Sequence, residues 1–249
     1  MLFLRSLIFV SFHVITIVLF SFVSILVWPL PFKHRYYVVR QWAVLNIWML
    51  EKICGISYQI EKIEEIPDEP CIIMCKHQSA WETLAVQAIF PPQVWVLKRE
   101  LLWIPFFGWG LAALNPIAID RGAGRKALNQ VVEQGKERLA SGSWIVIFPE
   151  GTRVPSGQMG RFGIGGAKLA IESGYPVVPI AHDAGKAWPR NQFIKKPSVI
   201  KLVIGAKITT EDKTVAELNQ EIYQWMEGQM TKLEGKRPTT SLKGAKKRG

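Results

Sequence analysis

A long uncharged segment near the N-terminus limits what this chain can fold into. No Lys, Arg, Asp or Glu occurs between Ser6 and Phe32, and most residues of the segment are apolar. As an α-helix, the stretch from Leu7 to Leu30 would be roughly 36 Å long at about 1.5 Å per residue. That length covers a hydrocarbon core of about 30 Å, so we expect a helix that enters a membrane.

A cleaved signal peptide is the alternative interpretation of this segment. It agrees poorly with the sequence, because the apolar run is too long and no A-x-A-like cleavage site follows it. The flanking charges are asymmetric, since Arg5 precedes the run whereas Lys33, Arg35 and Arg40 follow it. If the segment spans the bilayer, this bias predicts that the domain that follows lies in the cytoplasm.

The next segment, Tyr36 to Cys54, has the pattern of an amphipathic helix. At 100° per residue its charged residues gather in one arc of about 120°, with a mainly apolar face opposite, although Val44, Trp48 and Asn46 depart from this division. The pattern favours a helix that lies in the membrane interface, and a helix packed into a protein core is the alternative. Residues 1–54 therefore predict an N-terminal helical membrane-anchoring hairpin, which either spans the bilayer or enters one leaflet without crossing it.

The composition agrees with a membrane as the partner. The chain is 49% hydrophobic, contains ten Trp and carries a formal net charge of +11. Such a protein can bind nucleic acid or an anionic membrane surface, and the uncharged segment favours the membrane, so we expect no nucleic-acid partner. The three cysteines, Cys54, Cys71 and Cys75, are an odd number and predict no disulfide framework, which indicates a reducing compartment.

From Gly55 onward, strand-like and helix-like segments alternate, which predicts an α/β domain over residues 55–234 with a largely parallel central sheet flanked by helices. We expect a C-terminal helix over Thr214–Leu233 and a basic disordered tail over 235–249. The strand-like runs are 56–63, 71–76, 94–98, 116–120, 143–148, 176–181 and 199–205, and the clearest helices are Ser79–Phe90, Lys126–Ser141 and Gly165–Ser173.

The stretch "KHQSAWETL" places His77 after an apolar strand and Glu82 five residues later. On one helix these residues would lie about 140° apart, but across a strand-to-helix turn the carboxylate can face the imidazole. Glu82 would then hold one ring nitrogen as N–H and leave the other as a general base for a hydroxyl. The alternative is that Ser79 and Glu82 form only a capping box, and the two interpretations are compatible.

The stretch "FPEGTR" follows the apolar strand that ends at Phe148. Its polar residues are presented at the carboxyl end of a strand, which is the edge where open α/β sheets bind ligands. Arg153 can bind a phosphate through two parallel hydrogen bonds, and Thr152 offers a hydroxyl donor. A surface turn in which Glu150 and Arg153 merely pair is the alternative.

Several other cations follow predicted strands or lie in the glycine-rich stretch "GRFGIGGAK" and suggest an anionic substrate, although each could be an ordinary surface charge. They are Lys98, Arg99, Arg121, Arg161 and Lys168. We expect no metal site, because Cys71 and Cys75 would lie about 13 Å apart on a strand and no second ligand pair completes a set. His182 also ends a strand, but no carboxylate follows it at a matching spacing, so we expect a structural role.

Four segments taken together resemble the glycerolipid acyltransferase family, and in particular the bacterial lysophosphatidic acid (1-acyl-sn-glycerol-3-phosphate) acyltransferases. In chain order they are "HQSAWE", "LNPIAIDR", "FPEGTR" and "VVPIA", and the likeness covers about residues 55–205. The first block of the family has His, four residues and Asp, so Glu82 stands here where Asp is usual.

The resemblance implies the role of each matching residue. His77 is expected to deprotonate the 2-hydroxyl of the acceptor, with Glu82 beside it, and Pro179 to lie toward the acyl donor. Glu150, Gly151, Thr152 and Arg153 are expected to hold the acceptor, with Arg153 on its phosphate and Arg121 adding to that site. The expected donor is a cosubstrate, acyl-CoA or acyl carrier protein, and no cofactor or metal is implied.

The resemblance to bacterial enzymes also implies a place in the inner membrane, with the catalytic domain on the cytoplasmic face and lysophosphatidic acid and membrane lipids as partners. Two rival functions remain open at this point. Another lysolipid, such as a lyso-ornithine lipid, could be the acceptor, or the protein could bind lipid without catalysis. Because both His77 and an intact "FPEGTR" are present, the sequence favours the enzyme.

Overall fold

The computed structural model describes residues 1–241 of the chain, apart from the side chain of Arg121. Its centre is a seven-stranded sheet in the order β1-β8-β7-β2-β5-β3-β4, in which every neighbouring pair is parallel except β7 and β8. This confirms the predicted α/β class with a largely parallel sheet. The strands are β1 (Ile56–Lys62), β2 (Ile72–Cys75), β3 (Gln93–Lys98), β4 (Ile117–Ile119), β5 (Trp144–Ile147), β7 (Val177–His182) and β8 (Ser198–Ile204).

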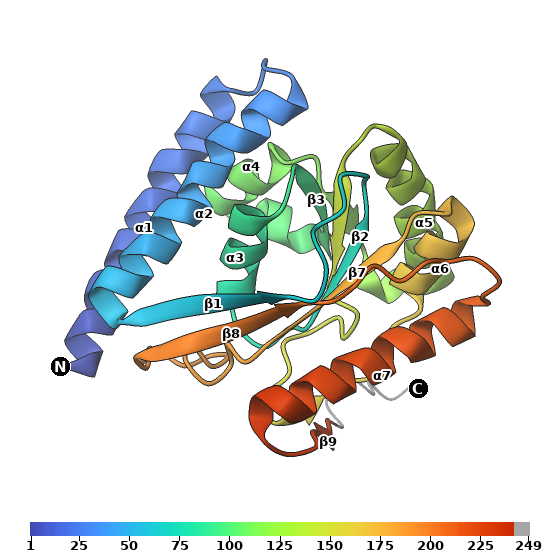
Figure 1. Ribbon diagram of the computed structural model, residues 1–249. Helices are drawn as coiled ribbons and strands as arrows, with labels where there is room; N and C mark the ends of the chain where they lie inside the picture. The colour runs from blue at the N-terminus through green and yellow to red at the C-terminus, as the bar shows by residue number, and fades with distance from the viewer. Residues whose placement is uncertain (242–249) are drawn as a thin grey trace.

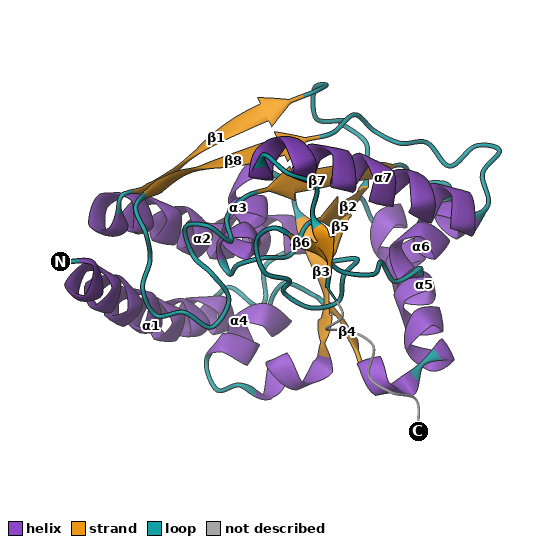
Figure 2. Ribbon diagram, turned by 90° about the horizontal axis from the view of Figure 1, so that it is seen from below, coloured by secondary structure: helices purple, strands orange, loops and turns teal. Residues whose placement is uncertain are grey.

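Helices cover both faces of the sheet, as Figures 1 and 2 show. One face carries α3 (Trp81–Ile89) and α4 (Phe107–Ala112) together with the N-terminal pair α1 (Leu2–Leu26) and α2 (Phe32–Cys54). The other face carries α5 (Arg125–Ala140), α6 (Gly165–Ser173) and α7 (Val215–Glu234). Two 3₁₀ turns, η1 (Arg99–Trp103) and η2 (Arg121–Ala123), and two short strands, β6 (Gln158–Met159) and β9 (Thr239–Thr240), complete the described elements.

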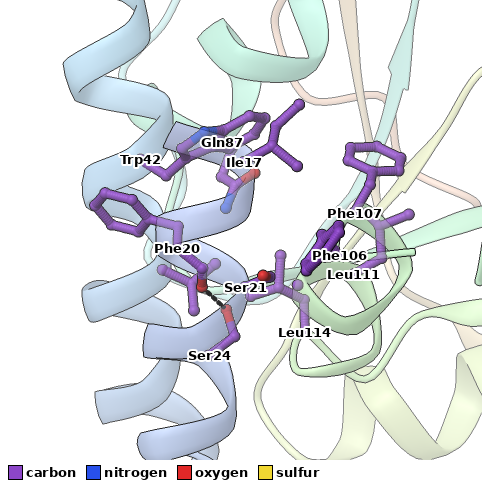
Figure 3. A pocket seen from close by; sticks show the side chains of 12 residues that line it. Ile17, Phe20, Ser21, Ser24, Trp42, Gln87, Phe106, Phe107, Leu111 and Leu114 are labelled. Atoms are coloured by element: carbon purple, nitrogen blue, oxygen red, sulfur yellow. Dashed lines mark hydrogen bonds between the residues drawn. The ribbon is translucent and has the colours of Figure 1, made fainter. Parts of the chain in front are cut away.

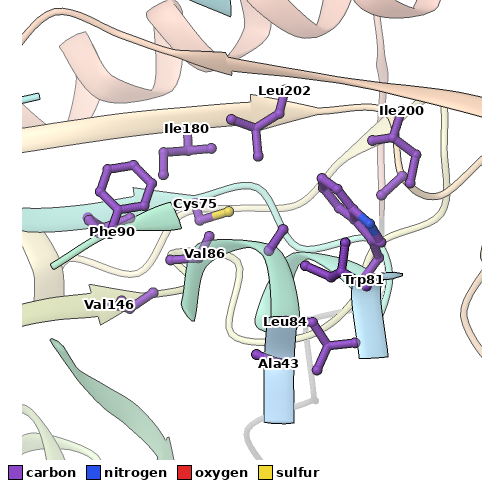
Figure 4. Close-up of a cluster of buried hydrophobic side chains, with 14 of the residues drawn as sticks. Ala43, Cys75, Trp81, Leu84, Val86, Phe90, Val146, Ile180, Ile200 and Leu202 are labelled. Atoms are coloured by element: carbon purple, nitrogen blue, oxygen red, sulfur yellow. The ribbon is translucent and has the colours of Figure 1, made fainter. Parts of the chain in front are cut away.

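The central strands are apolar on both faces because helices pack on both sides of them. Along β2, Ile73 and Cys75 face the α2–α3 side, where they pack with Trp81 (Figure 4), whereas Ile72 and Met74 face the α5–α7 side. All four strand residues are fully buried. Burying one such side chain contributes about 1.5–3 kcal/mol, so this alternation holds the sheet between its two helical layers.

The N-terminal helices α1 and α2 pack against each other as an antiparallel hairpin, as predicted. The connection carries Pro29 and Pro31, and α1 therefore ends at Leu26 rather than at Leu30. Helix α1 is long and apolar enough to cross a membrane, with a mean hydropathy of 2.4 over its most apolar window. It also rests on the catalytic domain, since Phe9 is fully buried in the core.

Polar side chains join α1 and α2 on their inner faces. Nδ1 of His13 lies 2.7 Å from Oδ1 of Asn46, and Nε1 of Trp42 donates to Oγ1 of Thr16 over 3.2 Å. Asn46 Nδ2 donates to the same Thr16 hydroxyl over 3.2 Å. In an apolar environment such groups need partners, so these contacts fix how the two helices pack.

The C-terminal tail differs from the prediction over residues 235–241. Gly235 ends α7 in the left-handed conformation, with a φ of 73°, and turns the chain back. Thr239 and Thr240 then pair with β6, and Arg237 forms an ion pair with Glu227 at 2.9 Å. The prediction of disorder is therefore wrong for this part, because the turn brings the tail onto a strand, and residues 242–249 lie outside the described residues.

Candidate active site

The register of the sheet brings three chain segments together at the carboxyl edge of its parallel strands. On β2, Cys75 pairs with Ile180 of β7 and Met74 pairs with Ile147 of β5. Residues shortly after these positions, in particular His77, His182 and the 148–153 loop, are therefore neighbours. A backbone hydrogen bond from Val154 N to His77 O, 2.8 Å long, ties that loop to the end of β2.

The carboxylate of Glu82 faces His77 across the turn between β2 and α3. Nδ1 of His77 lies 2.8 Å from Oε1 of Glu82, whose side chain is fully buried. The same oxygen accepts the backbone N–H groups of Gln78 at 2.9 Å and Ser79 at 2.8 Å. One oxygen thus serves both the imidazole and the start of the helix.

The capping box that the sequence predicts is half formed. Glu82 reaches back to the N–H of Ser79, but Oγ of Ser79 accepts from the N–H of Trp81, at 3.2 Å, and not from that of Glu82. The helix is assigned Ala80 as its N-cap. Glu82 therefore stabilises the helix start and contacts His77 at the same time.

The charge state of Glu82 decides which nitrogen of His77 carries a proton. Burial raises the pKa of Glu82, but the nearby histidines His182 and His77 and the Ser79 N–H outweigh burial, and the pKa lies below its usual value. An ionised carboxylate only accepts hydrogen bonds, so Nδ1 of His77 must donate. Nε2 of His77 then has a free lone pair, which is what a general base requires.

The ring of His77 is held on its flat side by Phe148. The two ring centroids are 3.8 Å apart and the planes are inclined by 12°. The imidazole remains partly exposed and lines an open cavity of about 200 Å³. The other lining residues are Trp42, Thr83, Gln87, Trp95, Val96, Leu97, Leu101, Phe107, Leu111, Phe148 and Arg153.

Glu150, which the sequence predicts to hold the acceptor, is not among the residues that line this cavity. Its carboxylate binds Nζ of Lys76 at 2.7 and 2.8 Å, and both side chains are fully buried. It also accepts the backbone N–H of His77 at 3.1 Å and that of Gly160 at 2.8 Å. These contacts fix the backbone of His77 and the position of Lys76.

The rest of "FPEGTR" forms a turn at the cavity edge. Gly151 has a φ of 64°, which L-residues rarely adopt, so glycine is required here. Arg153 lines the cavity that His77 also lines. Nη1 of Arg190, on the loop after β7, donates to Oγ1 of Thr152 at 3.3 Å and to the carbonyl of Arg153 at 2.9 Å. Arg190 thus supports the turn.

Of the predicted cations whose side chains the structure describes, only Arg153 lines the His77 cavity. Lys98 is half-exposed, forms an ion pair with Glu100 at 2.8 Å, and is absent from the cavity lining. Its position at the end of β3 directs it to the surface. The side chain of Arg121 lies outside the described part of the structure.

Sequence reasoning missed Lys76 and Arg190, which support the site. Lys76 ends an apolar run and looks like the first solvated residue after a strand, although it is fully buried. Arg190 lies in a loop with no recognisable pattern. Lys76 pairs with Glu150, and Arg190 bonds to Thr152 and Arg153, all far away in the sequence. Their structural roles can therefore be seen only in the tertiary structure.

A second, narrow cavity, of about 40 Å³, lies between α1, α2 and α4. Figure 3 shows Phe20 and Ile17 of α1 on one side and Phe106, Phe107 and Leu111 on the other. It shares Trp42, Gln87, Phe107 and Leu111 with the His77 cavity, so the two spaces are adjacent. Its lining is almost entirely apolar.

Within residues 1–241, no group of three His, Cys, Asp or Glu side chains is placed to hold a metal ion. The cysteines nearest His77 are also poor ligands. Burial and nearby Glu69 raise the pKa of Cys71 to about 12, and burial raises the pKa of Cys75 well above its usual value. Thiolates at either position are therefore disfavoured.

Comparisons with known proteins agree with this arrangement. The profile of the family described as Acyltransferase matches residues 57–183. A 1-acyl-sn-glycerol-3-phosphate acyltransferase of Pseudomonas aeruginosa is 48% identical over 208 residues, which cover 82% of this chain and 81% of that protein. An enzyme of the same name from Cocos nucifera is 27% identical over 216 residues, or 85% of this chain and 68% of that protein.

A solved structure has the same fold. The crystal structure of the 1-acyl-sn-glycerophosphate acyltransferase PlsC from Thermotoga maritima superposes with a TM-score of 0.78 and covers 94% of this chain and 96% of that chain. The sequence identity is 22%, so this likeness concerns the fold. The coverage includes the N-terminal helices as well as the α/β domain.

Proposed function

The chain belongs to the PlsC-type 1-acyl-sn-glycerol-3-phosphate acyltransferase family, and on this premise we propose which residues carry its reaction. The enzyme acylates 1-acyl-sn-glycerol-3-phosphate and forms phosphatidic acid, a step of phospholipid biosynthesis. Its two substrates are therefore lysophosphatidic acid and an acyl donor.

His77 acts as the general base. Its Nε2 takes the proton of the acceptor's 2-hydroxyl while that oxygen attacks the thioester carbonyl of the donor. The tetrahedral intermediate then loses the thiolate, which receives the proton from the imidazolium, so the products are an ester and a free thiol. Because both substrates bind together, no acyl-enzyme is needed, and general base catalysis of this kind typically supplies about 10²–10⁴-fold.

Glu82 is the positioning residue for His77. Its hydrogen bond to Nδ1, 2.8 Å long, selects the tautomer with a free Nε2. The negative charge also stabilises the imidazolium that forms during the attack. Since the side chain is fully buried, no water competes for this contact.

Arg153 binds the phosphate of the acceptor. It lines the same cavity as His77, and its planar guanidinium can pair two phosphate oxygens. Thr152 contributes a hydroxyl and Arg121 a further cation, while Gly151 and Glu150 shape the turn from which Arg153 projects. Lys98 would act only at the periphery, because Glu100 already pairs with it.

The apolar lining of the narrow gap between α1, α2 and α4 supports the direction in which an acyl chain would extend from the His77 cavity. Its wall of phenylalanine, leucine and isoleucine side chains favours hydrocarbon over water. Trp42 and Phe107 border both spaces, so a chain lying there would leave its carbonyl end toward His77. The donor is acyl-CoA or acyl carrier protein.

The apolar helix α1 indicates membrane association, which matches substrates that reside in a bilayer. We place the enzyme in the inner membrane with its catalytic domain on the cytoplasmic face. The charges that follow α1 favour this orientation, since cytoplasmic flanks carry the excess of Lys and Arg. The same side supplies the donor.

The observation that carries the proposal is that His77, oriented by Glu82, shares one cavity with Arg153. The test is an acylation assay with purified full-length protein in mixed micelles. The acceptors are lysophosphatidic acid and a lyso-ornithine lipid, each offered with acyl-CoA and with acylated acyl carrier protein, and the products are measured by mass spectrometry. We expect phosphatidic acid, and preferential acylation of the lyso-ornithine lipid would overturn the proposed acceptor.

A substitution at Arg153 tests the phosphate assignment in the same assay. Arg153→Lys keeps the positive charge but loses the planar fork, so the KM for lysophosphatidic acid should rise about tenfold or more. The KM for the donor should change little. Unaltered acceptor kinetics would remove Arg153 from the phosphate site.

A further inference from the structure

The segment of residues 99–112, made of η1, a tight turn and α4, exposes large apolar side chains that the proposed chemistry does not use. Trp103 is 70% exposed, Ile104 44% and Trp109 41%. Soluble surfaces rarely gather such residues without a partner. We refer to this segment as the docking turn.

The docking turn has a fixed shape. Phe106 adopts a left-handed φ of 63°, a conformation that costs about 1–3 kcal/mol for a residue with a side chain. A Cβ atom on Gly108 would lie 2.2 Å from the carbonyl oxygen of Leu102, so the two arms of the turn can approach only because this residue is glycine. The exposed side chains are therefore presented by a rigid element.

The docking turn is attached to the N-terminal helices at two points. The ring of Phe22 on α1 lies 6.1 Å from the ring of Phe106 and 6.4 Å from that of Trp109. Arg35 of α2 donates to the carbonyl of Ala113, the residue directly after the docking turn, at 2.6 Å. Motion of the turn relative to α1 and α2 is thereby restricted.

The exposed aromatic surface continues from the helices onto the docking turn. Among the described residues, the exposed tryptophans are Trp28, Trp48, Trp103 and Trp109. The N-terminal helices or their connection carry two of them, and the docking turn carries the others. Tryptophan is enriched where a protein meets the interface of a bilayer, so exposed tryptophans on elements joined by the Phe22–Trp109 contact favour a common lipid-facing side.

We propose that the docking turn is a third membrane-binding element, which inserts Trp103 and Ile104 at the boundary of head groups and acyl chains in an anionic bilayer. This inference rests on the proposed membrane anchoring by α1 and α2. Arg99, exposed at the start of the turn, adds a positive charge near anionic head groups.

The placement has a consequence for the reaction. Leu101, Phe107 and Leu111 of the same segment line the His77 cavity, whereas Trp103 and Ile104 face outward. Insertion of the outer side chains would hold the cavity against the bilayer. A lysolipid could then reach His77 without transferring its acyl chain through water.

Depth-dependent fluorescence quenching tests the inference. Trp103→Cys is labelled with an environment-sensitive fluorophore, which is selective because Cys54, Cys71 and Cys75 are all buried. The protein is reconstituted with vesicles of phosphatidylethanolamine and phosphatidylglycerol that contain brominated acyl chains. Leu19→Cys on α1 is the positive control, and Gln220→Cys on α7, which lies on the opposite face of the sheet, is the negative control.

We expect quenching and a blue shift for the labels at positions 103 and 19, but not at position 220. If only position 19 is quenched, the docking turn stays out of the bilayer and the inference is wrong, while the anchoring proposal stands. If position 19 is not quenched either, the anchoring proposal fails and this inference fails with it. Neither result tests the proposal that His77 is the general base and that Arg153 binds the phosphate.

A kinetic test uses Trp103→Glu, with Trp103→Phe as the matched apolar variant. Removing one interfacial aromatic side chain should lower activity on vesicle-borne lysophosphatidic acid about tenfold. Activity on a short-chain, water-soluble acceptor should remain unchanged, because Trp103 does not line the cavity. Ile164→Glu, at an exposed apolar residue beside α6, should leave both activities intact. An equal loss on both acceptors would overturn the inference.

Discussion

Two histidines, His77 shortly after β2 and His182 at the end of β7, lie on neighbouring parallel strands and face the same carboxylate, yet their environments differ. Oε1 of Glu82 is 2.8 Å from Nδ1 of His77, and Oε2 is 3.9 Å from Nε2 of His182. The His77 side chain is 14% exposed, whereas that of His182 is fully buried. One histidine lies at the cavity and the other lies in the core.

Both ring nitrogens of His182 have partners inside the protein. Nε2 donates to the carbonyl of Lys76 over 2.8 Å, and Nδ1 accepts the N–H of Ala184 over 3.3 Å. Burial lowers the pKa of His182 despite the nearby Glu82, so the ring is held neutral. A histidine at the carboxyl edge of the sheet is therefore not a general base by position alone. It also needs a ring nitrogen whose lone pair is free and faces the cavity.

Removal of the His77 imidazole should have the largest effect. His77→Ala should lower turnover by about 10²–10⁴, which is the typical contribution of a general base. Ala also removes the Nδ1 donor of buried Glu82 and the ring stacked on Phe148, so the melting temperature should fall and turnover is measured per folded molecule. His77→Asn is the matched control, because its amide can still donate to Glu82 but cannot act as a base. A His77→Asn enzyme with normal turnover would contradict the assignment.

The equivalent change at His182 should act on stability instead. His182→Ala leaves the Lys76 carbonyl without its side-chain partner and opens a cavity, which should cost about 2 kcal/mol and lower the melting temperature by roughly 4–8 °C. Turnover per folded molecule should stay within about threefold. If folded His182→Ala lost as much turnover as His77→Ala, both histidines would belong to the catalytic machinery.

Replacement of the carboxylate between the two histidines separates catalysis from capping. A glutamine carbonyl can still accept the backbone N–H groups of Gln78 and Ser79, so Glu82→Gln should keep the helix start and a nearly normal melting temperature. Turnover should fall about tenfold or more, because the charge that stabilises the imidazolium is gone. The loss should be much smaller in a His77→Ala background. Full turnover in a folded Glu82→Gln enzyme would show that Glu82 only stabilises the start of the helix and does not assist His77.

The sheet was predictable because the central strands are buried on both faces and give continuous apolar runs. The strand order was not, since the pairings join segments far apart in the chain. The docking turn was missed because α4 has only six residues, with glycine at positions 108 and 110, too short for helical periodicity. The tail was predicted to be disordered from its composition, and composition gives no indication that Thr239 and Thr240 pair with β6.

The site was predictable where its contacts are local. The five-residue spacing of His77 and Glu82 already indicated a contact across a turn. Glu150 could not be assigned in this way, because its partner Lys76 lies 74 residues away. A buried lysine after an apolar strand looks like a surface lysine until the tertiary structure is known.

The smallest effect that we predict separates the two histidines by protonation. The folded-state pKa of His182 lies below the unfolded value of 6.5, so the unfolded chain binds the proton at higher pH. Stability from this residue is thus complete above pH 6.5 and is lost as the pH falls from there toward the folded pKa, by at most about 1.4 kcal/mol per pH unit. Glu82 opposes this loss and Lys76 favours it, but burial is the larger cause.

Melting temperatures measured between pH 7.5 and about 5.5 should therefore fall less steeply for His182→Gln, which removes the titrating ring, than for the natural protein. His34→Gln, at an exposed histidine, is the matched control and should retain the natural slope. If His182→Gln kept the full slope, the buried ring would not be the group that titrates, and the contrast between the two histidines would have to rest on exposure alone.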